Sequence, residues 1–214
     1  MTNQTKIVKK MWNTHHYSGE INEKGEPHGK GIIKNICSGT EFRGEFQNGK
    51  SHGVGTLTTA EGDKYKGYFK DGLLHGEGMF LTHNGHKCIG QYKNGVLEGH
   101  GTLVLNDGSF YEGCWKSNNK HGKGTWSKQD GEFYEGNFKQ GKFHGKGVYE
   151  LKGAVYKGSF KNGLMHGRGC MHIPGKSVKK GFWIHNYFVG SNFFSVLRNF
   201  FDGFFNIVKK QLKN

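Results

Sequence analysis

The chain has 214 residues, with 31 Lys and Arg against 17 Asp and Glu, so its formal net charge is +14 at pH 7 and acidic partners are expected. Glycine contributes 37 residues and proline only 2, which excludes a collagen-like chain or a proline-rich linker and indicates many tight turns. The four cysteines are scattered, no signal peptide is recognised and no run of 18 apolar residues exists, so we expect free thiols, a cytoplasmic location and no membrane-spanning helix.

The first segment, residues 1–13, matches nothing else in the chain. It carries Lys6, Lys9 and Lys10. We expect it to be a lead-in to the array that follows, with a frayed leading strand.

A repeat occupies residues 14–190, and its clearest copy is Tyr134–Gly147. Its constant positions are an aromatic residue, Gly and a second aromatic residue at alternate positions, then a turn Gly, then His-Gly-x-Gly. The copies begin at Tyr17, Phe42, Tyr65, Cys88, Tyr111, Tyr134 and Tyr156, and a degenerate eighth begins near Lys179. Most starts are 23 residues apart, a period typical of stacked repeat units.

Each copy predicts a β-hairpin, because its aromatic-x-Gly-x-aromatic segment has the two-residue period of a strand. Pairs such as Asn48-Gly49 and Asp71-Gly72 supply the positive φ of a tight turn. A second strand is expected after His-Gly-x-Gly, with one apolar residue in register: Ile33, Leu57, Phe80, Leu103, Trp126, Tyr149 and Met171. Further turns, such as Glu61-Gly62, lead to the next copy. The predicted fold is therefore all-β, an elongated single-layer antiparallel meander of stacked hairpins.

The aromatic positions form two series along this sheet. One interpretation is that the rings are simply the core. The other is that a single layer leaves its apolar side uncovered, and that exposed ring edges line a groove for a partner segment. The residues assigned to this groove are Tyr65, Phe69, Tyr92, Tyr111, Trp115, Tyr134, Phe138, Tyr156 and Phe160.

The last segment, residues 191–214, has helical periodicity and predicts one amphipathic helix. Its apolar face includes Phe193, Leu197, Phe200, Phe201, Phe204 and Phe205. Two roles stay open for this helix. It caps the final repeats and hides these side chains, or it projects as a membrane anchor or partner helix.

Two patterns that look catalytic or nucleotide-binding are discounted. Gly44–Ser51 fits the phosphate-loop formula, but it crosses a predicted hairpin and its equivalents in other copies lack the Lys. Histidines recur in one position of the repeat, at His28, His52, His75, His121, His144 and His166. Copies roughly 10 Å apart cannot share one zinc ion, so we expect each imidazole to hydrogen-bond its own turn. No catalytic residues, metal or cofactor are expected.

A basic series follows the second aromatic position: Lys70, Lys93, Lys116, Lys139 and Lys161. A solvated edge explains it most simply. The alternatives are contact with an anionic membrane or with an acidic protein surface; nucleic acid is not expected.

The unit Tyr-x-Gly-x-Phe-x-x-Gly-x-x-His-Gly-x-Gly resembles the MORN (membrane occupation and recognition nexus) repeat over about four-fifths of the chain. Departures are Cys88 in the first aromatic position, Glu98 for His, Asn118 for the turn Gly, and one extra residue in the first copy. The resemblance implies hairpin arrays without catalytic residues that serve membrane junctions, cytoskeletal scaffolds and myosin tails. In that family such arrays also lie beside lipid-kinase or methyltransferase domains, for which we expect no room here, so the resemblance implies a stand-alone adaptor.

The leading functional hypothesis is a non-enzymatic scaffold that holds a segment of a cytoskeletal, motor or membrane-linked protein in its aromatic groove. The alternative is a peripheral membrane protein that binds anionic phospholipid through the Lys series and the terminal helix. A homodimer is a further alternative.

Overall fold

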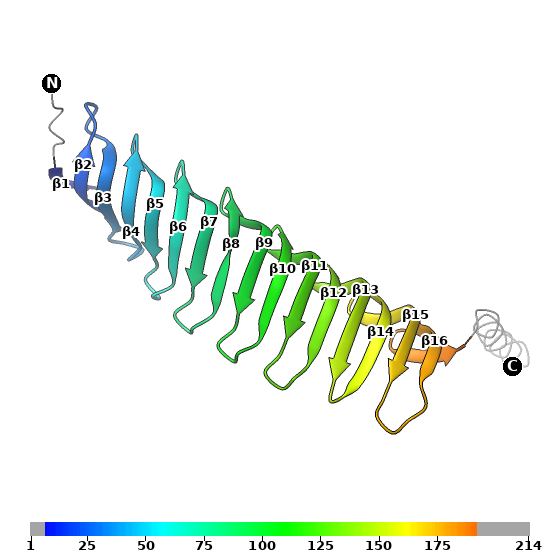
Figure 1. Ribbon diagram of the computed structural model, residues 1–214. Coiled ribbons are helices and arrows are strands. Elements are labelled where there is room, and N and C mark those ends of the chain that lie inside the picture. The colour runs from blue at the N-terminus through cyan, green and yellow to red at the C-terminus, as the bar shows by residue number, and fades with distance from the viewer. Residues whose placement is uncertain (1–6, 192–214) are drawn as a thin grey trace, which may run out of the picture. The chain divides into compact units, whose positions relative to one another are not determined.

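The computed structural model describes residues 7–191, which form strands and turns and contain no helix. The chain divides into two compact units at the junction between Asn119 and Lys120. We call residues 7–119 unit 1 and residues 120–191 unit 2, and describe each by itself (Figure 1). The expected C-terminal helix, with its apolar face of Phe193, Leu197, Phe200, Phe201, Phe204 and Phe205, lies outside the described residues.

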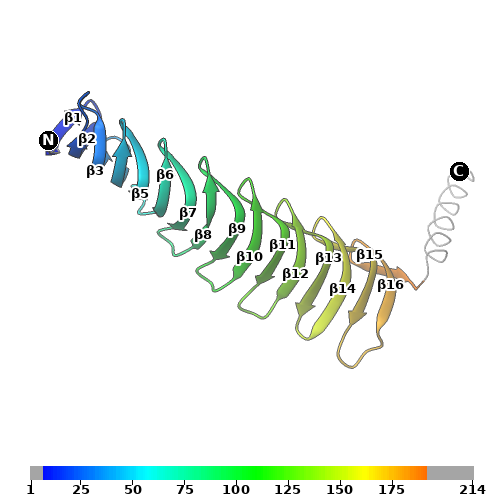
Figure 2. The ribbon, with the colours of Figure 1, turned by 45° about the horizontal axis from the view of Figure 1, so that its top comes forward.

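Unit 1 is an antiparallel meander. Its strands are β1 (Ile7–Trp12), β2 (His15–Ile21), β3 (Pro27–Asn35), β4 (Glu41–Gln47), β5 (Lys50–Thr58), β6 (Lys64–Lys70), β7 (Leu73–Leu81), β8 (Lys87–Lys93), β9 (Val96–Val104) and β10 (Phe110–Lys116). Each strand pairs with the next strand in the chain. The predicted class is therefore confirmed in this unit, and Figure 2 shows these strands in one layer.

Unit 2 repeats the arrangement. Its strands are β11 (Asn119–Ser127), β12 (Phe133–Lys139), β13 (Lys142–Leu151), β14 (Ala154–Lys161), β15 (Leu164–His172), β16 (Lys179–Ile184) and β17 (Tyr187–Gly190). Successive strands again pair antiparallel. The degenerate eighth copy is present as β16, because Gly181 lies opposite Gly169 and Trp183 lies opposite Gly167.

The short turns between paired strands have the predicted chemistry. Asn48 and Gly49 have φ values of 48° and 82°, and Asp71 and Gly72 have 50° and 87°. Positive φ at both central residues is what a type I′ hairpin turn requires, and Asn, Asp and Gly adopt it at little cost. Where Asn118 replaces the turn glycine, it keeps a positive φ of 61°.

The second strand of each hairpin begins earlier than the sequence suggested. Strand β5 starts at Lys50, directly after the turn, and runs through His52-Gly53-Val54-Gly55. The register shifts between Gly44 and Glu45 of the paired strand β4, and Gly53 has a φ of 63°. The first glycine of His-Gly-x-Gly therefore serves a β-bulge, which keeps the motif inside the strand.

Backbone bonds join the turn of each copy to the previous copy. The Gly49 N–H donates to the Pro27 carbonyl at 2.9 Å, and the Gly72 N–H donates to the Ser51 carbonyl at 2.9 Å. Asn118 makes the same bond to the Leu97 carbonyl at 3.1 Å, and its Oδ1 also accepts from the Leu97 N–H at 2.8 Å. The turns are thus fixed by their neighbours as well as by their own sequence.

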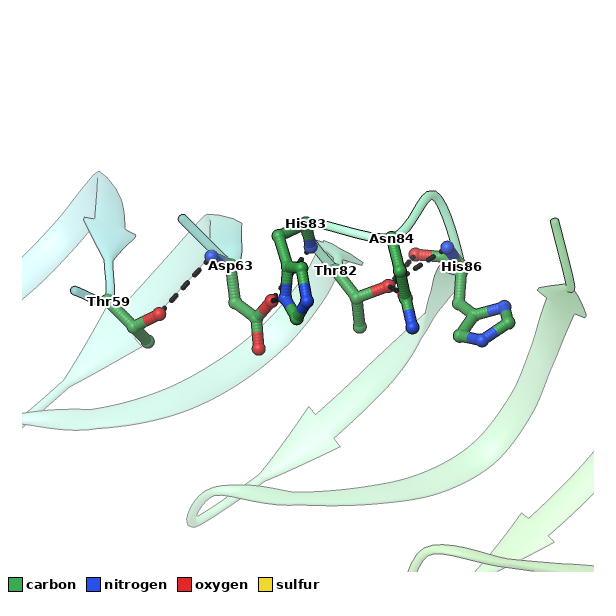
Figure 3. A network of polar contacts seen from close by, with 6 residues as sticks. All are labelled: Thr59, Asp63, Thr82, His83, Asn84 and His86. Atoms are coloured by element: carbon green, nitrogen blue, oxygen red, sulfur yellow. Dashed lines mark hydrogen bonds and ion pairs between the residues drawn. The ribbon is translucent and has the colours of Figure 1, made fainter. Parts of the chain in front are cut away.

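The turns at the opposite ends of the strands are also connected (Figure 3). The Asp63 carboxylate accepts from the His83 backbone N–H at 2.8 Å and contacts its Nδ1 at 2.9 Å. Thr59 Oγ1 accepts from the Asp63 N–H at 3.2 Å, and Thr82 Oγ1 accepts from the His86 N–H at 2.9 Å. The bonds from His83 hold the pKa of the Asp63 carboxyl below its usual value. These contacts align two successive turns.

Replacing Asn118 tests the turn. Glycine accepts the positive φ but loses the bond to the Leu97 N–H, so we expect Asn118→Gly to lower the free energy of unfolding by about 1 kcal/mol. Alanine loses the same bond and strains the backbone, so Asn118→Ala should cost about 1 kcal/mol more. Urea denaturation of both variants measures the difference. Equal stability of the two would show that the left-handed backbone carries no cost here.

Candidate partner-binding surface

The core of most hairpins is one ring lying across two glycines. Tyr134 is fully buried, and a Cβ built on Gly136 would lie 2.5 Å from its hydroxyl oxygen and 2.6 Å from the Gly147 Cα. A Cβ on Gly147 would also meet this ring, at 2.5 Å. Strands β12 and β13 place the two glycines opposite each other. We call the side of each unit that bears these rings its front face, and the other side its back face.

The hydroxyl group of the tyrosine at the first aromatic position donates a hydrogen bond within its own copy. Tyr111 donates to the Cys114 carbonyl at 2.8 Å, Tyr134 to the Asn137 carbonyl at 2.9 Å and Tyr156 to the Ser159 carbonyl at 3.1 Å. Each acceptor is three residues further on, next to the second aromatic position. Tyr17 makes the equivalent bond to the Glu20 carbonyl. The Tyr65 hydroxyl is buried without a partner.

Consecutive copies interlock through their rings. In unit 1, the Phe42 centroid lies 5.1 Å from Phe46 of its own copy and 4.8 Å from Phe69 of the next, both edge to face. In unit 2, Tyr156 lies 5.2 Å from both Phe160 and Trp183, again edge to face. This geometry is favourable for aromatic pairs. The core thus runs along each unit within a single layer.

The copy that begins at Cys88 lacks its first ring, and two other side chains fill the space. Leu97 is 5% exposed and lies where a Cβ on Gly90 would meet it at 2.8 Å. The Trp115 indole reaches across from the next copy and donates to the Gly101 carbonyl at 3.0 Å. Nothing in the sequence of this copy alone predicts that a neighbour supplies the ring.

The structure buries most of the residues assigned to the groove. Their exposed fractions are Tyr65 2%, Phe69 2%, Tyr111 0%, Trp115 8%, Tyr134 0%, Phe138 3%, Tyr156 0% and Phe160 5%. Tyr92 is half-buried. The interpretation of these rings as core is confirmed, and little of their surface is left for a partner. Contact of a partner with them stays a prediction.

A different set of apolar side chains offers surface on the front face. These residues are half-buried: Ile33, Leu57, Phe80 and Leu103 in unit 1, and Trp126, Tyr149 and Met171 in unit 2. Register places Trp126 opposite Tyr134, and Tyr149 opposite both Tyr134 and Tyr156. We call this set the front rows. Sequence reasoning recognised the series but did not assign it to the groove.

The basic series lies on the back faces. Lys70 and Lys93 end strands β6 and β8 of unit 1, as Lys116 ends β10, while Lys139 and Lys161 end β12 and β14 of unit 2. All five side chains are exposed. Contact with an anionic membrane through them stays a prediction.

The recurring histidines do not hydrogen-bond their own turns. The Nδ1 atoms of His52, His75, His144 and His166 are buried without a hydrogen-bond partner, so that expectation was wrong for them. His28 Nδ1 accepts from the Asn48 N–H at 3.5 Å, which belongs to the turn of the next copy. The His166 and His185 rings lie 5.4 Å apart. Burial, with Lys161 and His185 nearby, lowers the pKa of His166.

The described residues offer neither a metal site nor a membrane-spanning helix. Within residues 7–191, no three His, Cys, Asp or Glu side chains are placed to hold a metal ion. The same residues contain no helix that is long and apolar enough to cross a membrane. All four cysteines are free thiols. The front faces therefore offer partly exposed apolar side chains, while the back faces offer exposed cations and, in unit 1, also exposed apolar residues such as Val54, Tyr68 and Ile89.

Paired hairpins with a ring over two glycines define a repeat protein built from one recurring unit. Residues 42–64, 65–87, 88–110, 111–133, 134–152 and 156–178 each match the MORN repeat. The chain belongs to the MORN repeat family. The copy at Tyr17 lies outside these matches, yet its ring lies across Gly19 and Gly31 in the same manner.

Comparison with other proteins adds little. No curated protein gives a significant match. Among solved structures, the TCP10 domain of Danio rerio CPAP, in complex with a peptide of Danio rerio STIL, matches with 12% sequence identity and a TM-score of 0.25. The match covers 81% of this chain and 97% of that chain.

Adding one methyl group to Gly136 tests the ring packing. The new Cβ would clash with the Gly147 backbone and the Tyr134 hydroxyl, so we expect Gly136→Ala to destabilise unit 2 by roughly 3 kcal/mol. Glu135→Ala, at the neighbouring exposed position, is the matched control and should change stability by less than about 0.5 kcal/mol. Urea denaturation compares them. Similar midpoints for the two variants would contradict the proposed core.

Buried tyrosines predict loss of stability in alkali. Burial raises the pKa of Tyr65, Tyr134 and Tyr156 to about 12, above the usual value of 10.0. The unfolded chain ionises first, so their stabilisation is complete below about pH 10 and is lost towards about pH 12. The variant Tyr134→Phe/Tyr156→Phe lacks two of these hydroxyl groups, so it should lose less stability than wild type over this interval. Phenylalanine is tolerated at this position of the repeat, since Phe42 already occupies it. The test is the urea midpoint of each protein, measured across that pH range. If the midpoints of variant and wild type fall in parallel with pH, the buried tyrosines do not cause the loss.

Proposed function

We propose that the protein is a non-enzymatic scaffold that binds a segment of a partner protein along the front face of its MORN repeats. The observation that carries the proposal is the partly exposed apolar side chains of the front rows. Among residues 7–191 no helix or second sheet covers them, and large uncovered apolar surfaces usually mark interaction sites. The partner class expected from the sequence was a cytoskeletal, motor or membrane-linked protein.

The rigid core supports this role. Because the rings of Tyr134 and Tyr156 are fixed across their glycines, Tyr149 between them stands on a preformed surface. Its hydroxyl donates to the Glu132 carboxylate at 2.6 Å, which orients the side chain further. A surface ordered before binding loses little conformational freedom when a partner docks.

Site-specific photo-crosslinking tests the proposal. The photoreactive residue p-benzoylphenylalanine replaces Phe80 or Trp126 on the front faces. The adjacent residues Met79 and Thr125, which face the back, are the matched controls. The full chain is irradiated in lysate of the cells that produce it, and covalent products are identified by mass spectrometry.

Crosslinks to one protein from Phe80 or Trp126, and none from Met79 or Thr125, are the expected result. Thermal melts of each labelled protein establish that folding is retained. Absence of products from both front positions, or equal yield from front and back, would rule out a front-face partner site.

A further inference from the structure

Positive charge is distributed very unevenly between the two units. Residues 7–119 carry 13 Lys and Arg and 12 Asp and Glu, whereas residues 120–191 carry 13 and 4. Nearly the whole excess of the described chain therefore belongs to unit 2. The regular Lys series, which occurs in both units, does not account for this difference.

Register shows where the excess lies. On the back face of unit 2, Lys123 is opposite Asn137, Lys146 is opposite Ser159, and Arg168 is opposite Phe182. Lys157 lies opposite Val148 and Cys170, and Lys180 lies opposite Cys170. All five cations are exposed. We call Lys123, Lys146, Lys157, Arg168 and Lys180 the back cluster.

On the back face of unit 1, two cations lie opposite acids, whereas others, such as Lys66 opposite Thr56 and Met79, lie opposite neutral residues as in unit 2. Lys30 lies directly opposite Glu45, and Lys34 lies opposite Glu41, which also pairs with Arg43 at 3.5 Å. Within residues 120–191, the back cluster has no ion pair with a carboxylate. Strands β12 and β13 even place Lys139 opposite Lys142, an arrangement of like charges that destabilises a sheet. An anionic ligand would relieve both conditions.

We propose that the back cluster of unit 2 is a second binding site, and that it takes an acidic, extended polypeptide segment. From β11 to β16 the cluster spans roughly 24 Å, which about seven extended residues cover. The exposed acids Glu135 and Glu150 lie on the same face, opposite Val148 and Phe133. An extended segment can follow the cations past these two acids, whereas a flat anionic surface would meet the acids as well.

The chemistry of this face favours a polypeptide over a single-stranded nucleic acid. Nucleic acid sites of that kind need successive exposed rings on which bases stack. The rings of Tyr134, Tyr156 and Trp183 are buried on the front face. On the back, the Arg168 guanidinium lies 5.2 Å from the Phe182 ring, and the exposed Tyr187 lies on β17, beyond the strands of the cluster. Four of the five cations are lysines, which act as point charges and require no fixed geometry of the anion.

Fluorescence anisotropy with a labelled 15-residue poly-L-glutamate tests the site on the full chain. Wild type should bind the probe, and binding should weaken between 50 and 200 mM NaCl because the contact is exposed. The variant Lys146→Glu/Lys157→Glu/Lys180→Glu should raise the Kd at least about 10-fold. The control Lys50→Glu/Lys66→Glu/Lys93→Glu makes the same charge change in unit 1 and should raise it by less than about 2-fold. Thermal melts establish that both variants fold.

No binding by wild type, or an equal loss in both variants, would overturn the proposal. Phosphatidylserine vesicles and a 15-residue oligothymidylate are run in parallel with the same variants. If either binds through unit 2 while polyglutamate does not, the acidic polypeptide is the wrong ligand. The variants leave the front rows intact, so failure here is separate from failure of the front-face crosslinking.

Discussion

The packing of one aromatic ring across two glycines is the contact on which each unit depends. A single sheet has no second layer to cover its apolar side, so its core must be made within the layer. Tyr134 shows how: its ring occupies the space that side chains at Gly136 and Gly147 would fill. Edge-to-face contacts between copies, such as that of Tyr134 with Phe160, then extend this core across the strands. The regular placement of glycine follows from this packing.

Burial of the rings separates the core from the surfaces available for binding. The rings at the first and second aromatic positions are buried in the core, so the surface of the front face is formed by the residues opposite them, such as Phe80, Trp126 and Tyr149. The alternation of the strands sends every intervening side chain to the back. Each unit therefore offers two chemically different faces, and changes on one leave the rings and the other face in place.

The two units share the same repeat but differ in net charge. Both are built from the same hairpin, yet residues 7–119 carry 12 Asp and Glu against 13 Lys and Arg, while residues 120–191 carry 4 against 13. Among the described residues, the net charge is +1 in unit 1 and +9 in unit 2, so it is concentrated rather than spread. Concentrated charge on an exposed face guides association and selects partners by sign.

The sequence by itself determined the family, the hairpin unit and the chemistry of turns such as Asn48-Gly49, because these depend on local spacing and on backbone preferences of single residues. Tertiary structure alone decided that the rings are buried across their glycines, and that Trp115 fills the space left by the missing ring at Cys88. It also decided that Nδ1 of His52 and of His144 has no hydrogen-bond partner. Periodicity assigns a side chain to a face, but burial depends on neighbours one or two strands away. Bulges at residues such as Gly53 shift the register, so the residue opposite each cation emerges only when the strands are paired.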